Sequence, residues 1–401
     1  MNDRSLRDVL DRATELIEPP DLAAVALAEA RRRRTRRRGA VAALTAAAAV
    51  VVLIVSARVI TGDRTTEPPP ADPASSGTTQ VPVAPAIPVD RIQPLWDPRG
   101  VEGLPVLDLG VPQVLPVGTT GGVDTAVALL DRDDETLLVG SNGVQTTFDL
   151  PPGLGARRTV SLSPDGTRVA AVGISGFFWR SLAGAWTRVD VPTSVLGEWI
   201  EVTWMPGAQA VVLRGDLAGV RVDLSTGIQR ELGFLRGYVA WGPAPDGRVV
   251  AGSGPASASA PSVRELVGDQ SVRRTYLGPL ENLQRPVVGA ASIAAARANT
   301  SFPDPPAPDD QDGLIALERG SLATRAFLPV RYEASYYVDG GALTPRAWLD
   351  DDTVLFTVLP KGAAKEYLVA WNVDTGQLSR VACWPSDFDA TFAVALLANQ
   401  A

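Results

Sequence analysis

Two patterns of hydrophobic positions divide the chain. Residues 39–60 are almost continuously apolar, and their only ionised side chain is Arg58. At about 1.5 Å per residue, roughly 20 such residues cross the hydrocarbon core of a bilayer as one helix. From residue 95 onward, short β-rich runs are separated by Gly, Pro and Asp, which is typical of strands joined by turns. We therefore expect one transmembrane helix over 39–60 and an all-β domain over 95–401.

The β-rich part contains a repeated hairpin. Residues 160–172 (VSLSPDGTRVAAV) predict a strand, a tight Pro-Asp-Gly turn and a second strand. Similar units occur at 126–140, 202–213, 239–251, 287–297 and 347–358. A second hairpin follows most of them, at 177–191, 219–232, 263–277, 314–328 and 367–381. Two hairpins make a four-stranded sheet, and one sheet every 40 residues or so is typical of a β-propeller.

The number of blades and the closure of the ring also follow from this pattern. We expect about six blades between residues 125 and 384, with a long exposed loop at 299–312. The C-terminal residues 391–397 (TFAVALL) predict one more strand, which would complete the blade that begins near residue 125. Such closure removes an open sheet edge. A seven-bladed ring that uses residues 104–117 is the alternative.

The tryptophans have a register within the repeats. Trp204, Trp241 and Trp348 each stand two residues before the Pro or Asp of a turn. A shared position favours packing between blades over a stacking surface for sugars or peptides. Trp179 and Trp186 flank a hairpin instead, and they are better candidates for exposure.

Two resemblances follow from these motifs. The turns at 163–166 (SPDG) and 244–247 (APDG) resemble those of TolB-like and WD40-like bacterial propellers. That resemblance implies the architecture and says little about function. The first 60 or so residues resemble, mostly in composition, bacterial single-pass membrane proteins of the anti-sigma or sigma-associated kind, without the His–Cys–Cys zinc motif. This second resemblance implies a cytoplasmic regulator as a partner of residues 1–38.

Charge sets the expected topology. Seven arginines lie between Arg31 and Arg38, directly before the apolar stretch. Arginine on the N-terminal flank predicts that residues 1–38, an amphipathic and basic helical segment, stay in the cytoplasm. Residues 61–94, rich in Pro, Thr and Ser, would form an extended extracytoplasmic linker to the propeller. A cleaved signal peptide is the alternative to this retained anchor.

The split of charge bears on the partners. Residues 1–38 contain ten Arg and seven Asp plus Glu, a net charge of +3. Because the whole chain has a net charge of −8, the remaining residues have a net charge of −11. An acidic outer part argues against nucleic acid as a partner. We expect the arginines from Arg31 to Arg38 to contact anionic lipid headgroups at the inner face of the membrane.

Composition also excludes much chemistry. The chain has no histidine and one cysteine, Cys383. Catalytic triads with histidine, imidazole zinc sites and an intramolecular disulfide are therefore excluded. The acidic clusters at 131–135, 309–312 and 350–352 are interpreted as solvated turns, with weak calcium binding as the alternative. We predict no catalytic, metal or cofactor residue and no cofactor.

Together these patterns predict a single-pass cell-membrane protein with an extracytoplasmic β-propeller. Its expected role is non-catalytic binding or sensing of a protein, peptide or cell-wall glycan. One alternative is a transmembrane regulator whose cytoplasmic helices bind a sigma-type factor. The other is a hydrolase that uses paired carboxylates, as glycosidases do without histidine.

Overall fold

The computed structural model describes residues 82–399, except for 156–157, 197–200, 216–218, 233–237, 254–260, 268–269, 281, 299–310, 332 and 334–335. The predicted cytoplasmic segment, the membrane helix and linker residues 61–81 lie outside this part. Within it, no helix is long and apolar enough to cross a membrane. All described residues belong to one compact unit.

The described residues form six four-stranded antiparallel sheets, which we call blades 1 to 6. Blade 1 contains β24 (Asp389–Phe392), β1 (Ala126–Arg132), β2 (Glu135–Gly140) and β3 (Gln145–Thr147). Blade 2 contains β4 (Thr159–Leu162), β5 (Arg168–Gly173), β6 (Gly176–Ser181) and β7 (Thr187–Val189). Blade 3 contains β8 (Glu201–Trp204), β9 (Ala210–Arg214), β10 (Gly219–Asp223) and β11 (Gln229–Glu231). Every predicted hairpin in these three blades is present, so the repeat pattern is confirmed there.

The other three blades have the same order. Blade 4 contains β12 (Tyr238–Pro243), β13 (Val249–Ser253), β14 (Ser262–Val267) and β15 (Gln270–Tyr276). Blade 5 contains β16 (Leu283–Val288), β17 (Ser292–Arg297), β18 (Gly313–Glu318) and β19 (Thr324–Pro329). Blade 6 contains β20 (Leu343–Trp348), β21 (Thr353–Val358), β22 (Lys365–Asn372) and β23 (Leu378–Pro385). Short 3-10 turns lie at η1 (Val89–Arg91), η2 (Pro98–Gly103), η3 (Pro206–Ala208) and η5 (Gly278–Leu280).

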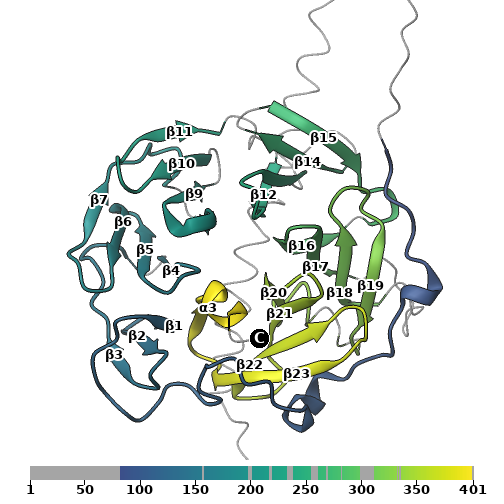
Figure 1. Cartoon of the computed structure of the whole chain (residues 1–401), viewed down its shortest axis with the longest axis horizontal. Coiled ribbons are helices and arrows are strands. Elements are labelled where there is room, and N and C mark those ends of the chain that lie inside the picture. The colour runs from purple at the N-terminus through teal and green to yellow at the C-terminus, as the bar shows by residue number, and fades with distance from the viewer. Residues whose placement is uncertain are drawn as a thin grey trace, which may run out of the picture. The chain divides into compact units, whose positions relative to one another are not determined.

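The blades form a closed ring (Figure 1). Contacts join the innermost strands of neighbouring blades from β4 through β8, β12 and β16 to β20. Blade 1 contacts blade 2 through β1 and β4, and its Val127 and Leu137 share a buried cluster with Leu355 and Leu368 of blade 6. The structure is therefore an all-β, six-bladed propeller.

The C-terminal strand closes the ring in the predicted blade. β24 is the innermost strand of blade 1 and pairs with β1, where Phe392 lies opposite Ala128. The strand was predicted to extend over 391–397, and this part is wrong, because Val394–Ala398 form the short helix α3. The Ala395 N–H donates to the carbonyl of Pro164 in blade 2, so the segment after β24 docks on the neighbouring blade instead of continuing the ladder.

The Pro-Asp-Gly turn of blade 2 shows why the hairpins form locally. Gly166 adopts φ +70°, a conformation that costs glycine little. One carboxylate oxygen of Asp165 accepts hydrogen bonds from the hydroxyls of Ser163 (2.6 Å) and Thr167 (2.9 Å). The short polar side chains therefore satisfy one another around the turn, and the two flanking strands emerge in antiparallel register.

Residues 82–120 run along the outer edges of four blades, and we call this segment the strap. Isolated bridges connect it to β15 through Val83, to β19 through Ile92, to Val330 directly after β19 through Trp96, to β23 through Val106 and Val114, and to β3 through Thr120. The strap is the dark blue segment beside blades 5 and 6 in Figure 1. It includes residues 104–117, which therefore contribute to no seventh blade. It covers sheet edges that would otherwise present unpaired backbone groups.

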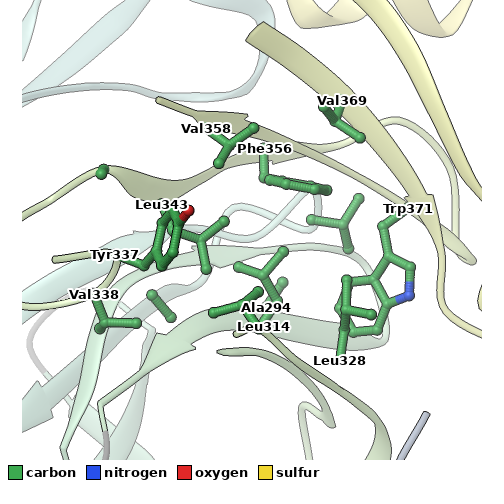
Figure 2. Close-up of a cluster of buried hydrophobic side chains, with 14 of the residues drawn as sticks. Ala294, Leu314, Leu328, Tyr337, Val338, Leu343, Phe356, Val358, Val369 and Trp371 are labelled. Atoms are coloured by element: carbon green, nitrogen blue, oxygen red, sulfur yellow. The ribbon is translucent and has the colours of Figure 1, made fainter. Parts of the chain in front are cut away.

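The largest buried cluster lies where blades 5 and 6 meet. Figure 2 shows Leu314 and Leu328 of blade 5 facing Phe356 and Trp371 of blade 6, and all four side chains are almost fully buried. Two tryptophans of the shared register also connect neighbouring blades. The Trp204 Nε1–H donates to Ser161 Oγ (3.1 Å), and the Trp348 Nε1–H donates to the carbonyl of Val287 (3.3 Å). For these two residues, the predicted packing between blades is confirmed.

Candidate functional site

A polar depression of about 270 Å³ lies where blades 4 and 5 meet. In blades 2 to 6, the turns between first and second strands and between third and fourth strands lie on one side of the ring, because successive strands are antiparallel. We call this side the hairpin face. The depression opens there, and it is lined by Asp246, Arg248, Glu265, Arg273, Ala290, Ala291, Arg319 and Gly320.

The backbone of blade 4 presents four of the five charged groups, namely those of Asp246, Arg248, Glu265 and Arg273. Asp246 lies in the Pro-Asp-Gly turn between β12 and β13, where its carboxylate accepts from the N–H of Arg248 (3.1 Å). Glu265 on β14 lies opposite Arg273 on β15, and the next pair is Leu266 with Ser271, so Val272 is an extra, bulged residue. The bulge puts Arg273 and Glu265 on the same side of the sheet, because directly paired residues share a face.

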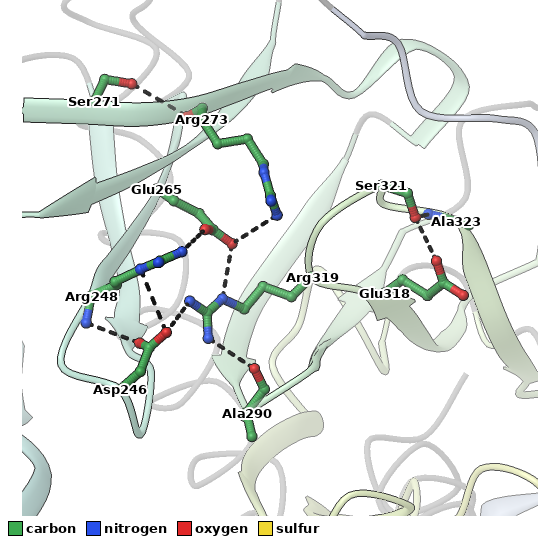
Figure 3. A network of polar contacts seen from close by, with 10 residues as sticks. All are labelled: Asp246, Arg248, Glu265, Ser271, Arg273, Ala290, Glu318, Arg319, Ser321 and Ala323. Atoms are coloured by element: carbon green, nitrogen blue, oxygen red, sulfur yellow. Dashed lines mark hydrogen bonds and ion pairs between the residues drawn. The ribbon is translucent and has the colours of Figure 1, made fainter.

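Arg319, from the turn after β18 in blade 5, is the centre of the cluster (Figure 3). Its Nε–H donates to Glu265 Oε1 (2.8 Å), and its two terminal nitrogens donate to Asp246 Oδ2 (2.8 Å) and to the carbonyl of Ala290 (2.9 Å). The side chains of Arg319 and Glu265 are 7% and 3% exposed. All three nitrogens of this buried guanidinium therefore donate a hydrogen bond, and the two to Glu265 and Asp246 join blade 5 to blade 4.

The other two arginines are held loosely. Arg248 approaches Glu265 Oε2 at 3.4 Å and Asp246 Oδ2 at 3.6 Å, and Arg273 Nη1 approaches Glu265 Oε1 at 3.8 Å. These distances exceed those of strong charge-assisted hydrogen bonds, about 2.7–2.9 Å. The two side chains are 42% and 49% exposed, so their guanidinium groups face the open depression.

The charges of the cluster shift two pKa values. Burial disfavours the charged form of Asp246, but hydrogen bonds from Arg319 and from the Arg248 backbone outweigh it and lower the pKa of Asp246. Burial also disfavours charge on Arg319, and the hydrogen bonds to Asp246 and Glu265 outweigh it and raise the pKa of Arg319. Three guanidiniums against two carboxylates leave one positive charge in excess, which suits recognition of an anion rather than proton transfer.

The replacement Asp246→Asn tests this assignment of charge. Because the folded pKa of Asp246 lies below its ordinary value of 3.8, the carboxylate adds stability above that pH and loses it as the pH falls through the folded pKa. We expect the variant to lose about 0.5–1 kcal/mol at pH 7, since Asp246 is partly exposed, and to match the parent below the folded pKa. Urea unfolding at a series of pH values measures this, with the exposed ion-pair residue Asp190→Asn as control. A loss that is the same at all pH values would contradict the assignment.

A related cluster lies at the next junction on the hairpin face. Arg325 of blade 5 donates to Asp352 (2.6 Å) and Asp374 (3.0 Å), which belong to two turns of blade 6. Burial disfavours charge on Arg325, and these hydrogen bonds outweigh it and raise its pKa. Here two exposed acids surround one arginine. This cluster therefore has the opposite charge balance from the depression.

The acidic clusters identified in the sequence lie at or beside turns, but the interpretation as solvated residues is wrong for two of them, since Asp131 on β1 is 14% exposed and Asp312 is 1% exposed. Asp131 accepts from Arg158 (3.0 Å) and from Thr136 (2.6 Å), and Asp350 accepts from the backbone N–H groups of Asp352 and Thr353. Of the cluster at 309–312, residues 309 and 310 lie outside the described residues. Among the described residues, no three His, Cys, Asp or Glu side chains are grouped as a metal site requires.

The remaining candidates are packed against neighbours. Trp179 and Trp186 are each half-buried, and the Trp186 Nε1–H donates to the carbonyl of Asp149 (3.0 Å). The side chain of Trp241 lies outside the described residues. None of the five residues that form the charged cluster was singled out in the sequence, because each occupies an ordinary turn or strand position.

These features define the class of protein: a six-bladed β-propeller with an arginine-rich depression on one face. No protein family profile matches the sequence, and no curated protein sequence is similar to it. Solved structures with a similar fold include TolB from Acinetobacter baumannii (13% identity over 69% of this chain and 68% of that one, TM-score 0.44). A putative TolB from Agrobacterium tumefaciens (12%, 67% and 97%, TM-score 0.43) and an oligogalacturonate lyase in complex with manganese (13%, 67% and 75%, TM-score 0.39) are also similar. Likenesses at this level carry no argument about what this chain binds.

Proposed function

We propose that this chain is a membrane-anchored, extracytoplasmic propeller that binds a protein, peptide or cell-wall ligand without catalysis. The observation that carries the proposal is the state of the charged groups in the depression. Asp246 and Glu265 are each tied to Arg319 at 2.8 Å, whereas Arg248 and Arg273 have only longer contacts and face the opening. In such a site, the N–H groups of Arg248 and Arg273 can donate hydrogen bonds to a ligand. The two carboxylates are paired with Arg319 and are therefore poorly suited to proton transfer.

Membrane anchoring is supported by the sequence. The apolar residues 39–60 follow the arginines between Arg31 and Arg38, and this order favours an inner N-terminus and an outer C-terminal domain. A sigma-type partner of residues 1–38 stays a prediction, since that segment lies outside the described residues. A carboxylate-dependent hydrolase also stays a prediction, and the arginine pairing of Asp246 gives it no support.

Two exposed isoleucines on opposite sides of the ring allow a matched test. Ile228 lies between β10 and β11 on the hairpin face, and Ile174 lies between β5 and β6 on the other face, with exposures of 67% and 74%. A photo-reactive amino acid at position 228 of the full-length chain is expected to give a discrete crosslinked product in intact cells. The same group at position 174 is expected to give none. An export-dependent reporter enzyme fused after Ala401 is expected to be active and verifies the topology. No crosslink at position 228, or a reporter active only in the cytoplasm, would contradict the proposal.

A further inference from the structure

We propose that the depression between blades 4 and 5 binds the C-terminal carboxylate of a peptide, held between Arg248 and Arg273 above Arg319. This deepens the proposed function and rests on it for the identity of the natural ligand. The binding chemistry itself depends only on the described residues.

Free hydrogen-bond donors are the first argument. A guanidinium has five N–H donors in a planar fork that fits a carboxylate with two parallel bonds. Arg319 uses its donors on Glu265, Asp246 and Ala290 at 2.8–2.9 Å. The side chain of Arg273, in contrast, approaches Glu265 only at 3.8 Å and is 49% exposed, so its donors can reach a ligand in the depression that it lines. Glu265 forms its short hydrogen bond with Arg319 and not with Arg273. Arg273 can therefore bind a second carboxylate, that of a ligand.

The charge of the cluster sets the ligand's charge. The depression contains three arginines and two carboxylates, an excess of one positive charge. A carboxylate carries one negative charge and neutralises that excess, whereas a phosphate group carries about 1.5–2 at neutral pH. The side chain of Glu265 is almost fully buried and stays in the cluster. The excess of one positive charge is therefore a property of the site without a ligand.

The hairpin that carries two of the lining residues also exposes apolar side chains. Val267 and Val272 belong to the β14–β15 hairpin that carries Glu265 and Arg273, and they are 53% and 52% exposed. Exposed valines on the hairpin that supplies Glu265 and Arg273 favour a carboxylate that is followed by an apolar group, as at the C-terminus of a peptide, over a bare anion.

Gly320 shapes one wall. A Cβ atom at this position would lie 2.8 Å from Arg273 Nη1, closer than two such atoms approach. The absence of a side chain at 320 thus leaves the guanidinium of Arg273 in its place over the turn. Gly320→Ala displaces that guanidinium and keeps every charge of the cluster, so it separates geometry from net charge.

The test uses N-acetyl-leucine, which combines a carboxylate with an apolar side chain, and its uncharged amide as the matched control. NMR titration of arginine Nε–H signals of the full-length chain in detergent micelles is expected to show saturable binding of the acid, with a dissociation constant on the order of millimolar. The amide is expected to leave these signals unchanged. Arg273→Gln is expected to weaken binding at least about tenfold, as loss of a charge-assisted pair would, and Gly320→Ala is expected to weaken it as well.

Four results would overturn the inference. They are equal shifts with acid and amide, equal affinity of the parent and Arg273→Gln, an unchanged affinity in Gly320→Ala, and tighter binding of inorganic phosphate than of N-acetyl-leucine. Crosslinking from position 228 together with any of these results would retain the proposed binding role and remove only the carboxylate site.

Discussion

Replacing Gly166 with alanine is expected to destabilise the propeller by about 3 kcal/mol, whereas the same change at Gly247 costs only about 1 kcal/mol. Both glycines occupy the same place in a Pro-Asp-Gly turn, with φ +70° and +78°. The left-handed conformation disfavours alanine equally at the two positions. A difference between the variants therefore measures what surrounds the turn.

The surroundings differ sharply. A Cβ at 166 would lie 2.2 Å from the carbonyl oxygen of Ala126 and 2.7 Å from a methyl group of Leu396. Around Gly247 no atom lies within 4 Å of the added carbon. The turn of blade 2 is thus a docking point for β1 and α3, and the turn of blade 4 is open. Urea unfolding monitored by tryptophan fluorescence gives both free energies, and equal losses would show that the close approach at Gly166 contributes nothing.

Gln93→Ala is expected to loosen the strap and expose the only cysteine of the chain to thiol reagents. Gln93 Nε2–H donates to the carbonyl of Val373 (2.8 Å), and Gln93 Oε1 accepts from the Nε1–H of the fully buried Trp371 (2.8 Å). Truncation leaves both groups without this partner, at a cost of about 2 kcal/mol. If the strap opens as one unit, this corresponds to roughly a 30-fold faster reaction at Cys383.

Cys383 is a suitable reporter because it is buried on β23, where its backbone pairs with the strap. The Leu115 N–H donates to its carbonyl (2.8 Å), and its own N–H donates to the carbonyl of Gln113 (2.9 Å). Burial raises the pKa of the thiol and so keeps it unreactive in the parent chain. Gln113→Ala, at an exposed position on the same strap, is the matched control. Equal labelling rates in the two variants would show that the strap is not a cooperative unit.

The repeat could be predicted from the sequence because each hairpin carries its own local signal. The turn at 163–166 fixes two strands by its Pro, Asp and Gly, and the recurrence of that unit predicts six blades. Closure was predicted from the strand pattern at 391–397, which would complete the blade that begins near residue 125. The extent of that strand was wrong, since 394–398 lie where the Ala395 N–H bonds to blade 2, a contact that no local pattern specifies.

The strap and the charged depression were beyond a local analysis for a physical reason. The strap has no alternation of its own, and its single bridges to β15, β19 and β23 exist only because the ring aligns those edges. Likewise Arg319 and Asp246 are 73 positions apart, and their hydrogen bond depends on two blades meeting. An aspartate in a Pro-Asp-Gly turn and an arginine after a strand are common, so neither residue signals a site by itself.

The path of the strap determines how the molecule would respond to tension on its N-terminal side. A pull on the residues before Pro82 is first borne by the two hydrogen bonds that join Pro82 and Ala84 to Tyr276. Gln93 and Trp96 come next, then Leu107 and Leu115, and only after these does the force reach β1. The strap would therefore lengthen in steps and dissipate mechanical work before any blade opens, which would shield the ring from movements of whatever the chain is tethered to.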